Sequence, residues 1–176
     1  PLRTGISHKH SVSVEMGGEK LRALADFSYS NTNGVMKGSD RRNISGDINV
    51  AYRYKKILFR NIMSIQSVRS NSSPYGSFSQ YANLNPYWSP YNTDGSMKRY
   101  LTDSKDPLGQ IGNPLYDAQL STKLTDTYNY LNNNFYVEAE VVNGLKAIAS
   151  VSVSSKRLDG EEFYPSNHSK FIKYTA

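Results

Sequence analysis

Hydrophobic and polar residues alternate along six segments of the chain. The connections between these segments are alternately tight turns and longer loops. The segments are Ser11–Met16, Leu21–Tyr29, Asn43–Arg53, Ile57–Val68, Tyr128–Val141 and Leu145–Ser155. The tight turns fall at Gly17-Gly18, Tyr54-Lys55-Lys56 and Asn143-Gly144, and Asn-Gly between alternating segments is a strong hairpin signal. The pattern predicts an all-β fold, an antiparallel up-and-down meander with short turns at one end and long loops at the other.

Every second residue of a strand points to the same face, so each segment divides into two rows. The rows separate well in five segments, while Ile57–Val68 has apolar residues on both rows and Leu24 breaks the pattern once. The apolar rows are Val12, Val14 and Met16; Leu21, Ala23, Ala25, Phe27 and Tyr29; Ile44, Ile48, Val50 and Tyr52; Phe135, Val137, Ala139 and Val141; and Leu145, Ala147, Ala149, Val151 and Val153.

Two architectures produce such rows. In a water-soluble β-sandwich the apolar rows of two sheets face each other and form a core. In a transmembrane β-barrel the apolar rows face lipid and the polar rows face a wet lumen, and short turns alternate with long loops. The alternation alone leaves both open, whereas the unequal connections favour the barrel.

A very long connection, residues 69–127, separates the fourth segment from the fifth and is rich in Pro, Gly, Asn, Ser and Tyr. Loops of this length are uncommon and are usually functional. Its first part, Ser73–Tyr91, spaces aromatic rings among prolines, which predicts a stiff aromatic platform without a helix or strand. The rings are those of Tyr75, Phe78, Tyr81, Tyr87, Trp88 and Tyr91, and they are the candidate residues for binding a ligand or partner.

Composition narrows the possible functions. The 176 residues include 14 Tyr, 6 Phe and 1 Trp, so most aromatic area carries a hydroxyl group suited to half-wet surfaces. The net charge of +6 is scattered, and no recognised module accompanies it, so nucleic-acid binding is not expected. No run approaches the ~18 apolar residues of a membrane helix, so any membrane contact must be made by strands. The start, Pro1–Gly5, lacks an initiator Met, and we expect a piece of a longer protein.

No catalytic, cofactor or metal site is predicted. His8 and His10 share a strand face, but no nearby carboxylate completes a metal site and His168 is remote in sequence. Glu138 and Glu140 also share a face, where lumen-lining charge is the favoured interpretation over acid-base chemistry. Cysteine is absent, which excludes a thiol nucleophile. The chain is therefore not expected to be an enzyme.

Several strings of residues resemble the SusC/RagA family of TonB-dependent outer-membrane transporters. Residues 8–56, HKHSVSVEMGGEKLRALADFSYSNTNGVMKGSDRRNISGDINVAYRYKK, are similar to early barrel strands of that family. The strings SPYGSFSQYANLNPYW and NPLYDAQLS, the latter at Asn113–Ser121, are similar to its surface loops. Each string is short, but their order and spacing span nearly the whole chain.

The resemblance implies a nutrient importer in the outer membrane. Residues 1–176 would be part of its barrel wall, about six strands, with the long aromatic loop at 69–127 outside the cell and the tight turns in the periplasm. The family's plug and TonB-contacting region are not in this sequence. The implied partners are TonB, a SusD-like lid lipoprotein, outer-membrane lipid, and an oligosaccharide or peptide substrate. The alternative is a secreted glycan-binding or adhesive β-sandwich.

The resemblance also gives the aromatic loop three possible roles. Its rings can pack on one another or on neighbouring loops, contact the lid protein, or contact substrate. Trp88 and Tyr87, flanked by Pro86 and Pro90, are the residues to test first for partner contact, because Trp and Tyr dominate interface hot spots.

Overall fold

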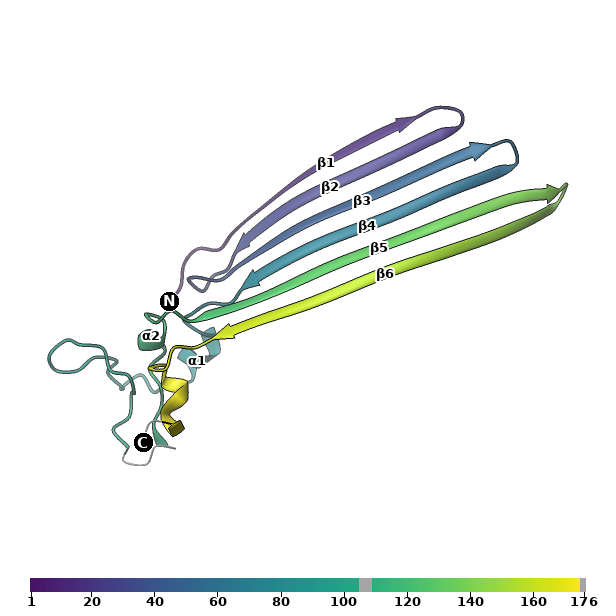
Figure 1. Cartoon of the computed structure of the whole chain (residues 1–176). Coiled ribbons are helices and arrows are strands. Elements are labelled where there is room, and N and C mark those ends of the chain that lie inside the picture. Colours follow the sequence, from purple (N-terminus) through teal and green to yellow (C-terminus); the bar gives the residue numbers. More distant parts are fainter. Residues whose placement is uncertain (105–108, 175–176) are drawn as a thin grey trace.

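The computed structural model describes residues 1–104 and 109–174, and its six β-strands form one antiparallel sheet in chain order (Figure 1). Each strand pairs with the next, and β1 and β6 are the two edges. The predicted all-β, up-and-down meander is therefore confirmed. The strands are β1 (Ile6–Gly17), β2 (Leu21–Asn33), β3 (Asp40–Tyr54), β4 (Ile57–Asn71), β5 (Lys123–Val142) and β6 (Leu145–Phe163).

The three predicted tight turns are present and lie together at one end of the sheet (Figure 1). Gly144 has φ +88°, a left-handed conformation that glycine adopts without steric cost, and Lys55 has φ +52°. Lys56 Nζ donates a hydrogen bond of 2.9 Å to Asn143 Oδ1, which joins two neighbouring turns. The turn between β3 and β4 is therefore linked to the turn between β5 and β6 by a side-chain contact.

The predicted strand ends were wrong at the loop end of the sheet. The connection predicted at Ser30–Arg41 shrinks to residues 34–39, and the long connection predicted at 69–127 spans residues 72–122. Strand β6 also continues past Ser155 to Phe163. The added residues are mostly polar, so side-chain alternation gave no signal, but their backbones pair in the sheet ladder regardless of side chain.

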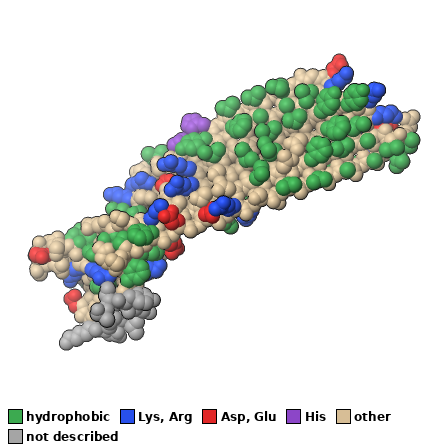
Figure 2. Space-filling model, in the orientation of Figure 1, with side chains coloured by type: hydrophobic (Ala, Val, Ile, Leu, Met, Phe, Trp, Pro, Cys, Tyr) green, Lys and Arg blue, Asp and Glu red, His purple; other side chains and the backbone are tan. Residues whose placement is uncertain are grey.

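The register gathers the predicted apolar rows on one face of the sheet. One row across all six strands contains Val14, Ala25, Ile48, Met63, Asn133 and Val153. Strand β4, whose alternation is poor in sequence, contributes Phe59, Met63 and Ile65 to this face. Figure 2 shows the resulting apolar field, which runs from a group of charged residues near the loop end to the turns.

The opposite face is polar and is laced by hydrogen bonds between strands. Its central row contains Ser13, Asp26, Asp47, Ser64, Asn132 and Ser154. Ser28 and Ser45 hydroxyls lie 2.8 Å apart, and Ser64 Oγ donates to Asp47 Oδ1 at 2.6 Å. One face of the sheet is therefore mainly apolar and the other mainly polar along the same strands, with exceptions such as Leu24 and Asn133.

Nothing among the described residues covers the apolar face. Val12 and Val151 are 63% and 65% exposed, and the buried apolar residues of the described chain are only Val68 and Leu101. All six strands belong to one sheet, so the alternative of a β-sandwich formed within these residues is wrong. Residues 1–104 and 109–174 therefore provide no second sheet layer with which to build a core.

The connections at the loop end fold into a separate small body that contains α1 (Phe78–Ala82), α2 (Pro114–Asp117) and a 3₁₀ helix (Ser169–Tyr174) (Figure 1). The expectation that Ser73–Tyr91 contains no helix was wrong. The Ser77 N–H donates to Gln80 Oε1 at 2.9 Å, which satisfies a backbone donor at the start of α1. No helix in the described parts of the chain is long and apolar enough to cross a membrane.

Candidate functional site

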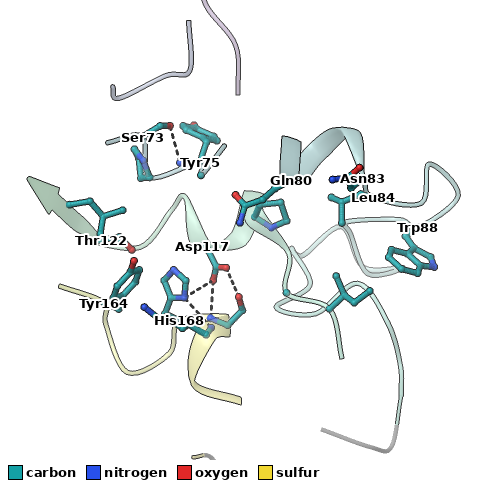
Figure 3. Close-up of a pocket in the computed structure, with 18 residues that line it drawn as sticks. Ser73, Tyr75, Gln80, Asn83, Leu84, Trp88, Asp117, Thr122, Tyr164 and His168 are labelled. Carbon is teal, nitrogen blue, oxygen red and sulfur yellow. Dashed lines mark hydrogen bonds and ion pairs between the residues drawn. The ribbon is translucent and has the colours of Figure 1, made fainter. Parts of the chain in front are cut away.

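A cavity of about 610 Å³ lies within the loop body, between segments that are far apart in the sequence (Figure 3). Its walls come from the start of the long connection, from the region around α2, and from the segment after β6. Aromatic and polar side chains share the lining, including Tyr75, Trp88, Asp117, Tyr164 and His168. Ligand sites commonly combine aromatic or apolar side chains with a few polar groups.

Asp117 anchors the segment after β6 against α2. Its side chain is nearly buried, its Oδ1 accepts a hydrogen bond of 2.9 Å from the Ser169 N–H, and its Oδ2 accepts one from the Ser169 hydroxyl. Both carboxylate oxygens are therefore engaged within the protein. This arrangement fixes one wall of the cavity and explains why a carboxylate can be buried there.

His168 lies beside Asp117, with 3.7 Å between Nδ1 and Oδ1. The Lys170 N–H donates to the same Nδ1 at 3.1 Å, so this nitrogen is an acceptor and the proton of the neutral ring resides on Nε2. The ring meets Tyr164 edge-on with 4.9 Å between centroids. Lys170 Nζ lies 3.9 Å from the centroid of the Tyr164 ring. The Tyr164 ring thus contacts both an imidazole and an ammonium group.

Asn113 holds the loops together behind the cavity. It is 1% exposed and caps α2, where Oδ1 accepts from the Leu115 N–H at 3.1 Å. Its Nδ2 donates to the carbonyl oxygens of Lys98 at 2.7 Å and Pro90 at 3.1 Å. One buried amide thereby joins three parts of the long connection.

The six predicted aromatic residues divide into two groups. Tyr75 and Trp88 line the cavity, and Tyr81 lies half-buried in a second hollow that Trp88 also lines. The other three point outward, with exposed fractions of 60% for Phe78, 93% for Tyr87 and 48% for Tyr91. The loop therefore uses part of its aromatic set for internal packing and presents the rest to the surroundings.

Burial raises the pKa of the Tyr81 hydroxyl to about 12, and the nearby Tyr75 and Asp117 add to the effect. The hydroxyl is enclosed without a hydrogen-bond partner in the protein. The ring therefore favours its neutral form, as expected for a packing residue.

The residues considered for chemistry lie apart from the cavity, except for His168. His8 and His10 are on the apolar face, with 5.5 Å between ring centroids. Glu138 accepts a hydrogen bond from the Lys146 ammonium at 2.8 Å and Glu140 lies 3.3 Å from Lys56 Nζ, both near the turns. The described residues contain no group of three His, Cys, Asp or Glu side chains able to hold a metal ion.

Sequence reasoning missed Asp117, Tyr164, Ser169 and Lys170 as cavity residues and set His168 aside as remote. The predicted meander could have indicated these residues. After six strands the chain returns to the end of the sheet where the long connection lies, so the segment after β6 is expected near that connection. The chain matches no known protein-family model and no curated protein.

Proposed function

We propose that this chain forms part of the wall of a TonB-dependent outer-membrane importer that takes up oligosaccharides or peptides with a SusD-like partner. One observation carries the proposal: a single sheet has an uncovered apolar face and a polar face along the same long strands. That is the arrangement required between lipid and a wet lumen. Open edges at β1 and β6 fit a segment that further strands complete on both sides.

The dimensions of the apolar field support the proposal. On β3 the field runs from Ile44 to Tyr54, which is roughly 33 Å along the strand at ~3.3 Å per residue. For a strand tilted by ~40°, this corresponds to about 25 Å across the bilayer, the height of the apolar band of such barrels. Tyr29 lies at one end of the field, and Tyr52 and Tyr54 lie at the other, as in aromatic girdles.

The proposed orientation places the loop body outside the cell and the turns in the periplasm. A tag inserted between Asp94 and Gly95 tests this, because Gly95 has φ +83° and open space around it. We expect antibody to label this tag on intact cells, with the protein in the outer-membrane fraction, whereas a tag at Asn143-Gly144 is labelled only after permeabilisation. A protein released into the medium would contradict the proposal and favour a secreted adhesive protein.

The proposed contact with a lid protein is best tested at Tyr87, because Trp88 is engaged in packing and its removal would disturb the loop. Exposed tyrosines are common interface hot spots, worth ~2 kcal/mol or more, so Tyr87→Ala should weaken lid binding at least about tenfold. Binding of the purified pair measures this. Tyr54 is also an exposed tyrosine but lies at the turn end, so Tyr54→Ala is the matched control and should leave the affinity for the lid protein unchanged. Unchanged affinity for Tyr87→Ala would remove the loop from the interface.

A further inference from the structure

Two arginines lie directly opposite each other on the apolar face, just beyond the loop-side edge of the apolar field. Arg42 on β3 and Arg69 on β4 are register partners, and both are exposed. Like charges in opposed positions, whose Cβ atoms are about 5 Å apart, destabilise a sheet. The pair therefore needs a compensating anion.

The described residues give this pair little compensation. Arg69 forms no ion pair with any of them, and Arg42 Nε lies 3.8 Å from Asp40 Oδ2. The Asp40 carboxylate also accepts a hydrogen bond from Asn71 Nδ2 at 2.9 Å, and it is the only carboxylate among the neighbouring strand positions of this face.

The other two Lys or Arg residues on this face of the strands, at the same end, form ion pairs. Arg157 lies 2.8 Å from Asp159, and Lys123 lies 2.7 Å from Glu161. Arg42 and Arg69 thus differ from Lys123 and Arg157 in lacking a close ion pair. Figure 2 shows charged side chains in this region, between the apolar field and the loop body.

The position of the pair indicates what the anion is. Between the row that contains Val12 and the turns, the strand residues of this face include no Lys, Arg, Asp or Glu. On the loop side of the row that contains Val12 comes the row that contains Tyr29 and Ile44, and the next row contains Arg42 and Arg69. The two arginines therefore lie close to the end of an uncharged field. In the proposed membrane orientation this is the level of the lipid headgroups.

We propose that Arg42 and Arg69 together bind the phosphate of a lipid headgroup in the leaflet at the loop end. This proposal rests on the proposed function. Arginine presents a planar fork of donors that matches phosphate oxygens, and a phosphate shared by both guanidiniums replaces their repulsion with two charge-assisted contacts. The side chains of Asn31 and Thr127, which flank the pair in the same row, are neutral and add no competing charge.

The test is native mass spectrometry of the full-length protein in detergent, titrated with bisphosphorylated lipid A and with the same lipid lacking its phosphates. We expect the phosphorylated lipid to bind at least about tenfold more tightly, because hydrogen bonds between two charged groups are stronger than those between neutral groups. Arg42→Gln with Arg69→Gln should abolish that preference. Arg41→Gln with Arg60→Gln is the matched control, since these two arginines lie on the polar face.

Equal binding of the two lipids, or an unchanged preference in the Arg42 and Arg69 double variant, would overturn the inference. Complete competition by inorganic phosphate at the same concentration as the lipid would also overturn it, because the ligand would then be free phosphate. Recovery of the protein in the outer-membrane fraction is scored separately. An inserted protein without the phosphate preference would contradict this inference alone, whereas a protein absent from the membrane would contradict the proposed function.

Discussion

Tyr81 has a hydroxyl group that the loops enclose without a hydrogen-bond partner in the protein. Burying an unpaired polar group costs free energy, and here the cost of burying the ionised form is greater still, which raises the pKa to about 12. The raised pKa of Tyr81 therefore reflects the burial of its hydroxyl group within the loop body. Its neighbour in the loop, Trp88, lines both hollows and belongs to the same packing.

The raised pKa predicts a pH dependence. An acid whose pKa is higher in the folded protein contributes stability that is complete below its unfolded value of 10.0 and is lost as the pH rises toward about 12. Tyr81→Phe should remove this part of the alkaline destabilisation and leave stability at neutral pH unchanged or slightly higher. Thermal melting of the full protein between about pH 10 and pH 12 measures it.

Tyr87→Phe is the control for this experiment, because the Tyr87 side chain is almost fully exposed. This variant should have the same melting temperature as the wild type at every pH. If Tyr81→Phe lost stability with pH as steeply as the wild type, burial of the Tyr81 hydroxyl would not account for the effect.

Strands β4 and β5 carry two amides within the apolar field, where polar groups are expensive. Asn61 Nδ2 donates to Asn133 Oδ1 at 2.7 Å, diagonally across the two strands, and both side chains are half-buried. Pairing the amides with each other satisfies part of their hydrogen-bonding capacity without water. The two strands therefore have a specific link on their apolar side in addition to the backbone ladder.

Removing one amide should cost more than removing both. Asn133→Leu leaves Asn61 Nδ2 with only its longer contact of 3.5 Å to the Asn134 carbonyl oxygen. This variant should destabilise the folded protein in a bilayer by about 1–3 kcal/mol, whereas Asn61→Leu with Asn133→Leu should be close to neutral. Denaturant unfolding in liposomes measures both. The control pair is Asn134 and Ser152 on the polar face, 2.5 Å apart, where water can replace a lost partner. A double variant as unstable as the single one would contradict the pairing.

At the scale of the strands, alternation in sequence predicted that each strand exists and which face is apolar, because burial chemistry acts on every second side chain. It did not predict where the strands end. Every residue from Asn31 to Asn33 is polar, and so is every residue from Lys123 to Thr127 except Leu124, so pairing with the neighbouring strands keeps these residues extended. Helix α1 was missed for a similar reason, since its start depends on a local contact between Ser77 and Gln80.

At the scale of the whole molecule, the sequence predicted the meander, its two unlike ends and the loop that bears the aromatic residues. The meander predicts that the segment after β6 returns to the loop end, but it does not predict that Tyr75, Asp117 and His168 line one cavity there, because this depends on how the connections fold. The division of the aromatic loop into packed and exposed rings also depends on that assembly. The polar face, the apolar field and the loop body are the three features on which the proposed function rests.

The central claim is that the apolar face of the sheet contacts lipid. The most direct measurement uses single cysteines in this chain, which has none of its own: Val50→Cys on the apolar face and Asn49→Cys, its neighbour on the polar face. In native membranes we predict that a lipid-soluble maleimide labels Val50→Cys and a water-soluble one labels Asn49→Cys. Labelling of Val50→Cys by the water-soluble reagent, or protection from both reagents, would contradict the account.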